Sequence, residues 1–145
     1  MVSLTYFASM IEFERHRLAN GLRVIVHRDE GTPMVTTNIL YDAGARDESP
    51  EATGFAHLFE HLMFEGTRDI PVFEVPVMMA GGENNAFTNN DLTNYYITLP
   101  ANNLETALWL ESDRMRGLDL ADARVNNQKS VVTEEFRQRY LNQPY

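Results

Sequence analysis

Cysteine is absent from the chain, which excludes disulfide bonds and thiolate metal sites but does not fix the cellular compartment. Long apolar runs are also missing, since none approaches the ~20 residues that a membrane-spanning helix requires. The N-terminal segment MVSLTYFASMIEFERHRLANG lacks a charged start followed by an apolar core. We therefore predict neither a membrane span nor a signal peptide in this chain.

Positive charge is scarce, because 12 Lys and Arg residues face 21 Asp and Glu residues and leave a formal net charge of −9. This balance argues against nucleic acid and anionic membrane surfaces as partners. It mildly favours cationic substrates, although a solvated acidic surface is the commoner cause. With 43% hydrophobic and 23% charged residues, the 145-residue chain has the profile of a soluble globular domain, or of part of a larger one.

The strand patterns predict an α+β fold with a mostly antiparallel sheet. Two extended runs flank Asn20-Gly21, a pair that strongly favours a hairpin turn. A third strand, rich in β-branched residues, is expected over residues 34–44. Two more are expected in NNAFTNN and LTNYYITLP, and one side chain of the pair Tyr95-Tyr96 should lie in the core.

Three segments have helical patterns. The first should run from Gly54 to Glu65, with Thr53 as its N-cap and Gly66 after its end. The segment NNLETALWLESDRM is expected to bury one face, and the last helix should cover residues 122–141. The expected buried face consists of Leu104, Ala107, Leu108 and Met115. Between the first two helices, Pro76 predicts a kinked or shortened helix.

The segment HLFEH, residues 57–61, is the strongest chemical signal in the chain. On a helix, His57 and His61 lie one turn apart on one face, and Glu60 shares that face. Two neutral imidazoles suit zinc, and a catalytic zinc site needs a third ligand and an open position for water. A nearby glutamate would serve as the general base. The remaining histidines, His16 and His27, are expected to be surface or structural residues.

Candidates for a third ligand lie in the last helix. The expected apolar stripe of this helix consists of Val125, Val132, Phe136 and Tyr140. Glu135 then lies on the shoulder of that stripe, whereas Glu134 faces water. Gln128 lies seven residues before Glu135 on the same side, where it could hydrogen-bond a ligand or the substrate. A single helical glutamate is usually solvated, so the paired histidines upstream are what make Glu135 a candidate.

Several segments, in this order along the chain, resemble the pitrilysin, insulin-degrading enzyme and mitochondrial processing peptidase family. Its members are the inverted zincins, whose motif is HxxEH. The resemblance covers about residues 12–145, is closest to the shorter bacterial members and rests on separate matches. The matching segments are NGLRVIVHRDEGTPMVTTNILYDAGARDE, TGFAHLFEHLMFEGT, GGENNAFTNNDLTNYYITLP, LETALWLESDRM and SVVTEEFRQRYLNQPY.

The resemblance implies a role for each matching position. His57, His61 and Glu135 would be the ligands of one zinc ion, and Glu60 the base that activates water. The strand that contains Asn85, Ala86 and Phe87 would pair with an extended peptide substrate, mostly through its backbone. Many relatives have a second glutamate seven residues before the third ligand, where this chain has Gln128.

Family members also carry a second, related domain, so we expect residues 1–145 to be the N-terminal portion of one zinc-peptidase domain. The rest of that domain and the second domain would be partners missing from this chain. The truncation should leave exposed sheet edges, through which the fragment would associate with itself, and should leave it inactive alone. A bacterial cytoplasmic or periplasmic location is expected.

The function predicted from these observations is zinc-dependent endoproteolysis of oligopeptides or unstructured segments. One alternative is a non-catalytic scaffold subunit of the same fold, since some family members have lost zinc. The other is a structural zinc module, which would use four protein ligands where the sequence offers three.

Overall fold

The computed structural model describes residues 11–141 of the chain. These residues form two compact units, which divide between Pro33 and Met34. The first unit is a β-hairpin, and the second is an antiparallel sheet with helices. All residues that the sequence analysis links to chemistry lie in the second unit.

The hairpin forms where the sequence predicts it. Strand β1 (Glu14–Arg17) pairs antiparallel with β2 (Arg23–Val26). Gly21 occupies the turn with φ +92°, a left-handed conformation that glycine adopts without strain. The side chain of Asn20 accepts a hydrogen bond of 3.1 Å from the backbone N–H of Leu22. Both residues therefore stabilise the turn, Asn20 through its side-chain hydrogen bond and Gly21 through its left-handed backbone conformation.

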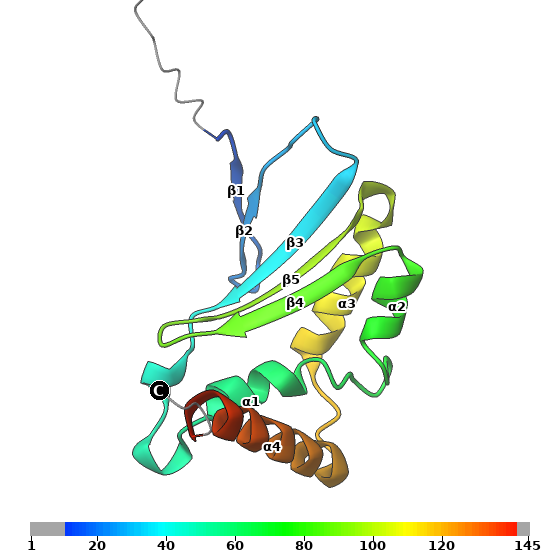
Figure 1. Ribbon diagram of the computed structural model, residues 1–145. Helices are drawn as coiled ribbons and strands as arrows, with labels where there is room; N and C mark the ends of the chain where they lie inside the picture. Colours follow the sequence, from blue (N-terminus) through cyan, green and yellow to red (C-terminus); the bar gives the residue numbers. More distant parts are fainter. Residues whose placement is uncertain (1–10, 142–145) are drawn as a thin grey trace, which may run out of the picture. The chain divides into compact units, whose positions relative to one another are not determined.

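The second unit is built on three antiparallel strands in the order β3-β5-β4 (Figure 1). They are β3 (Met34–Tyr41), β4 (Glu83–Thr88) and β5 (Thr93–Pro100). Central strand β5 is the most buried, and Tyr95 is only 2% exposed, so the prediction that the pair Tyr95-Tyr96 contributes to the core is confirmed. The α+β class with an antiparallel sheet is confirmed as well.

One face of this sheet is covered by helices α2 (Glu74–Met79) and α3 (Leu104–Arg116) (Figure 1). Each fully buried aliphatic or aromatic side chain between these layers stabilises the fold by about 1.5–3 kcal/mol. The central core cluster consists of Ile70, Phe73, Val77, Ile97, Leu99, Ala107 and Leu110.

Helix α2 is short, in agreement with the prediction for its proline. Pro76 is the third residue of the helix. In the first turn no backbone N–H has an intrahelical acceptor, so the missing N–H of proline costs no hydrogen bond there.

The predicted buried face of α3 is wrong at two positions. Leu108 is 53% exposed and Met115 39% exposed, whereas the charged residues Glu111 and Arg114 are buried. Arg114 donates hydrogen bonds of 2.7 and 2.5 Å to the Glu111 carboxylate, and its guanidinium lies 4.5 Å from the ring centroid of Tyr95. Pairing and ring stacking make burial of this charge tolerable, and a hydrophobic pattern cannot detect that.

Helix α1 (Phe55–Leu62) begins one residue later than predicted and ends three residues earlier. Its N-cap is Gly54, with φ +90°, so the prediction of Thr53 as the cap is wrong. The carboxylate of Glu48 accepts hydrogen bonds from the backbone N–H groups of Gly54 (2.8 Å) and Ala56 (2.7 Å). A residue distant along the loop thus satisfies helix donors that Thr53 does not.

Helix α4 (Asp122–Phe136) packs against α1 and continues into a single π-helical stretch, Arg137–Leu141. In its predicted apolar stripe, Val125 and Val132 are half-buried but Phe136 is exposed, and the side chain of Tyr140 lies outside the described part of the structure. Because no residue of α4 is fully buried, its inner face is available for polar groups.

Candidate metal site

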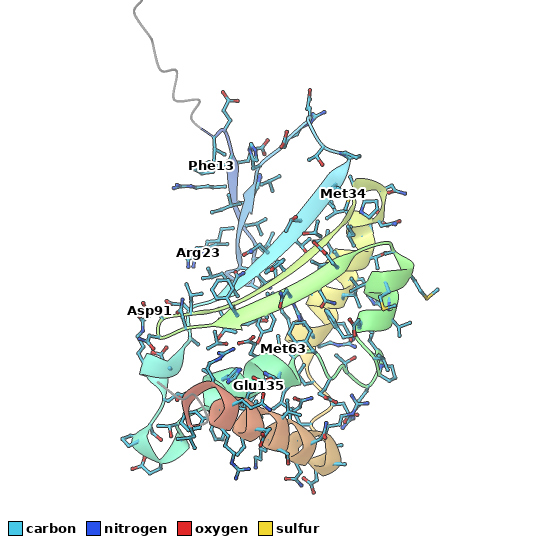
Figure 2. The ribbon with its side chains drawn as sticks, viewed as in Figure 1. Phe13, Arg23, Met34, Met63, Asp91 and Glu135 are labelled. Carbon is cyan, nitrogen blue, oxygen red and sulfur yellow. The ribbon has the colours of Figure 1, made fainter. Side chains whose placement is uncertain are left out.

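The two histidines of HLFEH lie close to one glutamate of α4. That residue, Glu135, is labelled in Figure 2 on α4, which packs against α1. The Nε2 atoms of His57 and His61 are 3.2 Å apart. Oε2 of Glu135 lies 3.4 Å from Nε2 of His57 and 3.6 Å from Nε2 of His61. Each of the three residues can offer one ligand atom to a common ion.

These spacings fit a tetrahedral ion. Zinc–nitrogen and zinc–oxygen bonds of about 2.0–2.2 Å imply ligand atoms about 3.3–3.6 Å apart in a tetrahedral site. The donor atoms of the three residues are separated by 3.2, 3.4 and 3.6 Å. Two imidazoles and one carboxylate also match the donor set of a catalytic site with a fourth position left open.

Gln128 contacts Nδ1 of His61, the ring nitrogen that does not belong to the group of three donor atoms. Its Oε1 atom lies 3.1 Å from Nδ1 of His61, and its Nε2 atom donates a hydrogen bond to the carboxylate of Glu65. A histidine that donates from Nδ1 keeps the lone pair of Nε2 for a metal. Gln128 therefore contacts one of the candidate metal ligands.

A cleft of about 910 Å³ opens over the three donor residues. Glu60 lines it from α1, on the same side as the histidines, as its place in the sequence predicts. From strand β4, Ala86 and Phe87 line the cleft, but Asn85 does not. The Asn85 side chain instead accepts a hydrogen bond of 2.8 Å from the backbone N–H of Ala86.

Negative charge predominates around this cleft. Its lining includes the carboxylates of Glu48, Glu60, Asp91 and Glu135, and the guanidinium of Arg139. Burial raises the pKa of the nearby Tyr95 phenol, with Arg114 opposing the shift and the charge of Glu60 adding to it. Two cleft carboxylates also have structural partners, since Asp91 pairs with Arg46 and Glu48 accepts the α1 N–H groups.

The residues that were not expected at the site have other partners. The carboxylate of Glu134 is exposed and lies 3.6 Å from Arg137. His16 contacts the Glu14 carboxylate within the hairpin, and His27 contacts the backbone carbonyl of Glu12. Among residues 11–141, neither histidine belongs to the group able to hold a metal.

Sequence reasoning missed two residues beside the site, Glu65 and Arg124. Arg124 donates a hydrogen bond to the Glu65 carbonyl and lies 4.0 Å from its carboxylate. Its spacing of four residues from Gln128 would have placed it on the same helical face. Glu65 follows the end of α1, so no periodic pattern indicates its position.

Comparison with known proteins gives consistent matches. Residues 23–143 match the insulinase family, peptidase family M16. The chain is 35% identical over 130 residues to zinc protease PqqE of Helicobacter pylori, covering 88% of this chain and 29% of that protein. It is 31% identical to the probable mitochondrial-processing peptidase subunit beta of Arabidopsis thaliana, covering 95% and 26%. It is also 31% identical to cytochrome b-c1 complex subunit 1 of Bos taurus, covering 90% and 27%.

Two solved structures share the fold. A protease from Helicobacter pylori matches with a TM-score of 0.88 and 34% identity, over 93% of this chain and 33% of that one. Pitrilysin matches with a TM-score of 0.79 and 21% identity, over 88% and 14%. The chain thus spans a third or less of the length of these proteins. Within residues 11–141, no helix combines the length and apolar character needed to cross a membrane.

Proposed function

Since this chain belongs to the insulinase family of peptidases, family M16, we propose that it forms the zinc-holding part of an endopeptidase. The observation that carries the proposal is the spacing of 3.2–3.6 Å among the donor atoms of His57, His61 and Glu135. The similarity to zinc protease PqqE supports zinc as the metal.

The proposed ligands and the proposed base have different roles, which follow from their positions. Zinc held by His57, His61 and Glu135 would polarise the scissile carbonyl and lower the pKa of a water molecule. Glu60 lines the same cleft, so its carboxylate is the group placed to take the proton of the attacking water and return it to the leaving amine. Gln128 keeps His61 in the tautomer whose Nε2 lone pair is free.

The proposed substrate is an oligopeptide or an unstructured polypeptide segment. Strand β4 is an edge of the sheet, and Ala86 and Phe87 lie where it borders the cleft. An extended peptide would add to this edge through backbone hydrogen bonds at Asn85, Ala86 and Phe87. The Asn85 side chain, which bonds the Ala86 N–H, would have to release it.

Two functions other than endoproteolysis are compatible with some of these residues. The similarity to cytochrome b-c1 complex subunit 1, which is part of a larger assembly, makes a scaffold subunit the first alternative. Against it, Glu60 and the three donor residues are all present in this chain. A structural zinc module would need a fourth protein ligand, and the donor group among the described residues contains three.

Metal analysis of purified variants tests the site directly. We expect about one zinc per chain in the wild type, and a reduction of at least tenfold in affinity for His57→Ala and Glu135→Gln, since each removes one of three ligands. Elemental analysis without added zinc, followed by competition with a chelator, measures both quantities.

The matched control is Glu134→Gln, which makes the same chemical change one residue away on the exposed side of α4. It should keep the wild-type zinc content. Equal losses in Glu134→Gln and Glu135→Gln, or full zinc content in His57→Ala, would contradict the proposed ligand set.

A further inference from the structure

A chain of polar side chains leads away from the metal site. It runs from His61 through Gln128 to Glu65 and Arg124. Nδ1 of His61 lies 3.1 Å from Oε1 of Gln128, whose Nε2 donates to Oε1 of Glu65. Nη1 of Arg124 lies 4.0 Å from Oε2 of Glu65 and also donates to its backbone carbonyl.

The neighbours of Gln128 decide which way its amide points. An amide has a donor end and an acceptor end of nearly equal size, so its own shape does not fix the orientation. An ionised carboxylate only accepts hydrogen bonds, so Glu65 attracts the NH₂ end. The carbonyl end then faces His61, whose Nδ1 must carry the proton. The lone pair of His61 Nε2 is then left on the side of the ring that faces Nε2 of His57 and Oε2 of Glu135.

Glu65 can orient the Gln128 amide because Arg124 holds the other side of the Glu65 carboxylate. Arg124 lies one helical turn from Gln128, and its guanidinium also contacts the Pro71 carbonyl at 3.3 Å and Asp119 at 3.4 Å. The side chains of Glu65 and Arg124 are 24% and 27% exposed, so water screens their interaction only in part. The carboxylate therefore lies between Arg124 and Gln128, with one oxygen toward each.

From this geometry we infer that Glu65 is a positioning residue for the metal site. It sets the orientation of the Gln128 amide and, through that amide, the tautomer of His61, while Arg124 holds Glu65 in place. The inference rests on the proposed function, because the tautomer matters for the binding of a metal. It is nevertheless testable without metal and without activity.

The first test reads the tautomer in the metal-free wild-type chain. Nitrogen-15 NMR of the histidine side chains, at a pH of about 8 where an unperturbed imidazole is neutral, distinguishes protonation at Nδ1 from protonation at Nε2. We expect His61 to be protonated at Nδ1. Protonation at Nε2 would overturn the inference. Absence of zinc binding would contradict the proposed function without changing this result.

The second test reverses the donor at position 65. In Glu65→Lys the ammonium only donates, so the Gln128 carbonyl should turn toward it and present the NH₂ end to His61. His61 would then accept at Nδ1 and carry its proton on Nε2. We expect this switch of tautomer, with zinc affinity reduced by about 10–100-fold, as for other changes beside a ligand. An unchanged tautomer would overturn the inference.

Two further variants separate orientation from charge. Glu134→Lys makes the same change of charge at an exposed position on α4 and should leave the tautomer of His61 and the zinc affinity unchanged. The double variant Glu65→Lys with Gln128→Glu places a carboxylate between two donors, so it should restore the Nδ1–H tautomer and the zinc affinity.

The double variant also covers the case in which Glu65→Lys does not fold, as judged by circular dichroism. The wild type and the double variant should then both show His61 protonated at Nδ1. An Nε2–H tautomer in the double variant, or zinc affinity as low as in Glu65→Lys, would overturn the inference.

Discussion

Three glutamates near the candidate metal site have different proposed roles, because their surroundings differ. Glu135 lies within 3.6 Å of both histidine Nε2 atoms, whereas Glu60 lines the cleft from the helix that carries those histidines. Glu65 contacts neither histidine directly and reaches His61 through Gln128. In the proposed site, the same type of side chain is therefore assigned to a ligand, a base and a positioning group according to its contacts.

Glu60→Gln should separate binding from chemistry. The amide keeps the size of the side chain but cannot take a proton, so zinc content should remain at the wild-type level. The turnover of a fluorogenic peptide should fall by about 10²–10⁴-fold. The assay requires the protein in its full natural length, because this chain spans a third or less of its relatives.

Glu51→Gln serves as the control for Glu60→Gln, because Glu51 is exposed on the loop before α1. It should leave turnover unchanged. Wild-type turnover in Glu60→Gln would rule out this residue as the base.

At the scale of elements, α1 depends on a contact from outside itself. It is eight residues long, and its N-cap residue, Gly54, offers no side chain for capping. The Glu48 carboxylate accepts two of its first N–H groups and adds a negative charge where the helix dipole favours one. A helix this short is not stable alone, so such contacts help to hold the histidines in place.

Glu48→Ala should therefore lower the free energy of unfolding by about 1 kcal/mol, within a range of about 0.5–2 kcal/mol for lost caps. Thr53→Ala, which removes the cap that the sequence suggested, should change the stability by less than about 0.5 kcal/mol. Urea unfolding followed by circular dichroism measures both values. A larger effect for Thr53→Ala than for Glu48→Ala would contradict the capping by Glu48.

At the scale of the whole molecule, the sheet of the second unit has two edges. Strand β5 pairs on both sides, whereas β3 and β4 each have one partner among the described strands. On β4 the side chain of Phe87 is 49% exposed. Unpaired backbone groups beside an exposed aromatic ring favour pairing with another chain.

We predict that the 145-residue chain self-associates as its concentration rises. Phe87→Lys should shift it toward the monomer, because a charge on an edge strand opposes edge-to-edge pairing. Leu108→Lys, on the exposed side of α3, should have little effect. Light scattering across a concentration series measures the mass, and a constant monomer mass for the wild type would disprove the prediction.

The sequence by itself determined the local geometry of the candidate site. The spacing of His57, Glu60 and His61 places them on one helical face, and the helical position of Glu135 distinguishes it from Glu134. These inferences depend only on the period of 3.6 residues per turn, which each helix follows regardless of its neighbours. The hairpin at Asn20-Gly21 is local in the same way.

Only the tertiary structure decided which distant groups meet. The cap of α1 comes from Glu48, the buried face of α3 contains an ion pair, and Gln128 contacts both Glu65 and His61. Each of these contacts joins residues from different elements or buries a charge that a hydrophobic pattern assigns to water. Periodicity describes one segment at a time, whereas the partners of a polar side chain depend on how the segments pack.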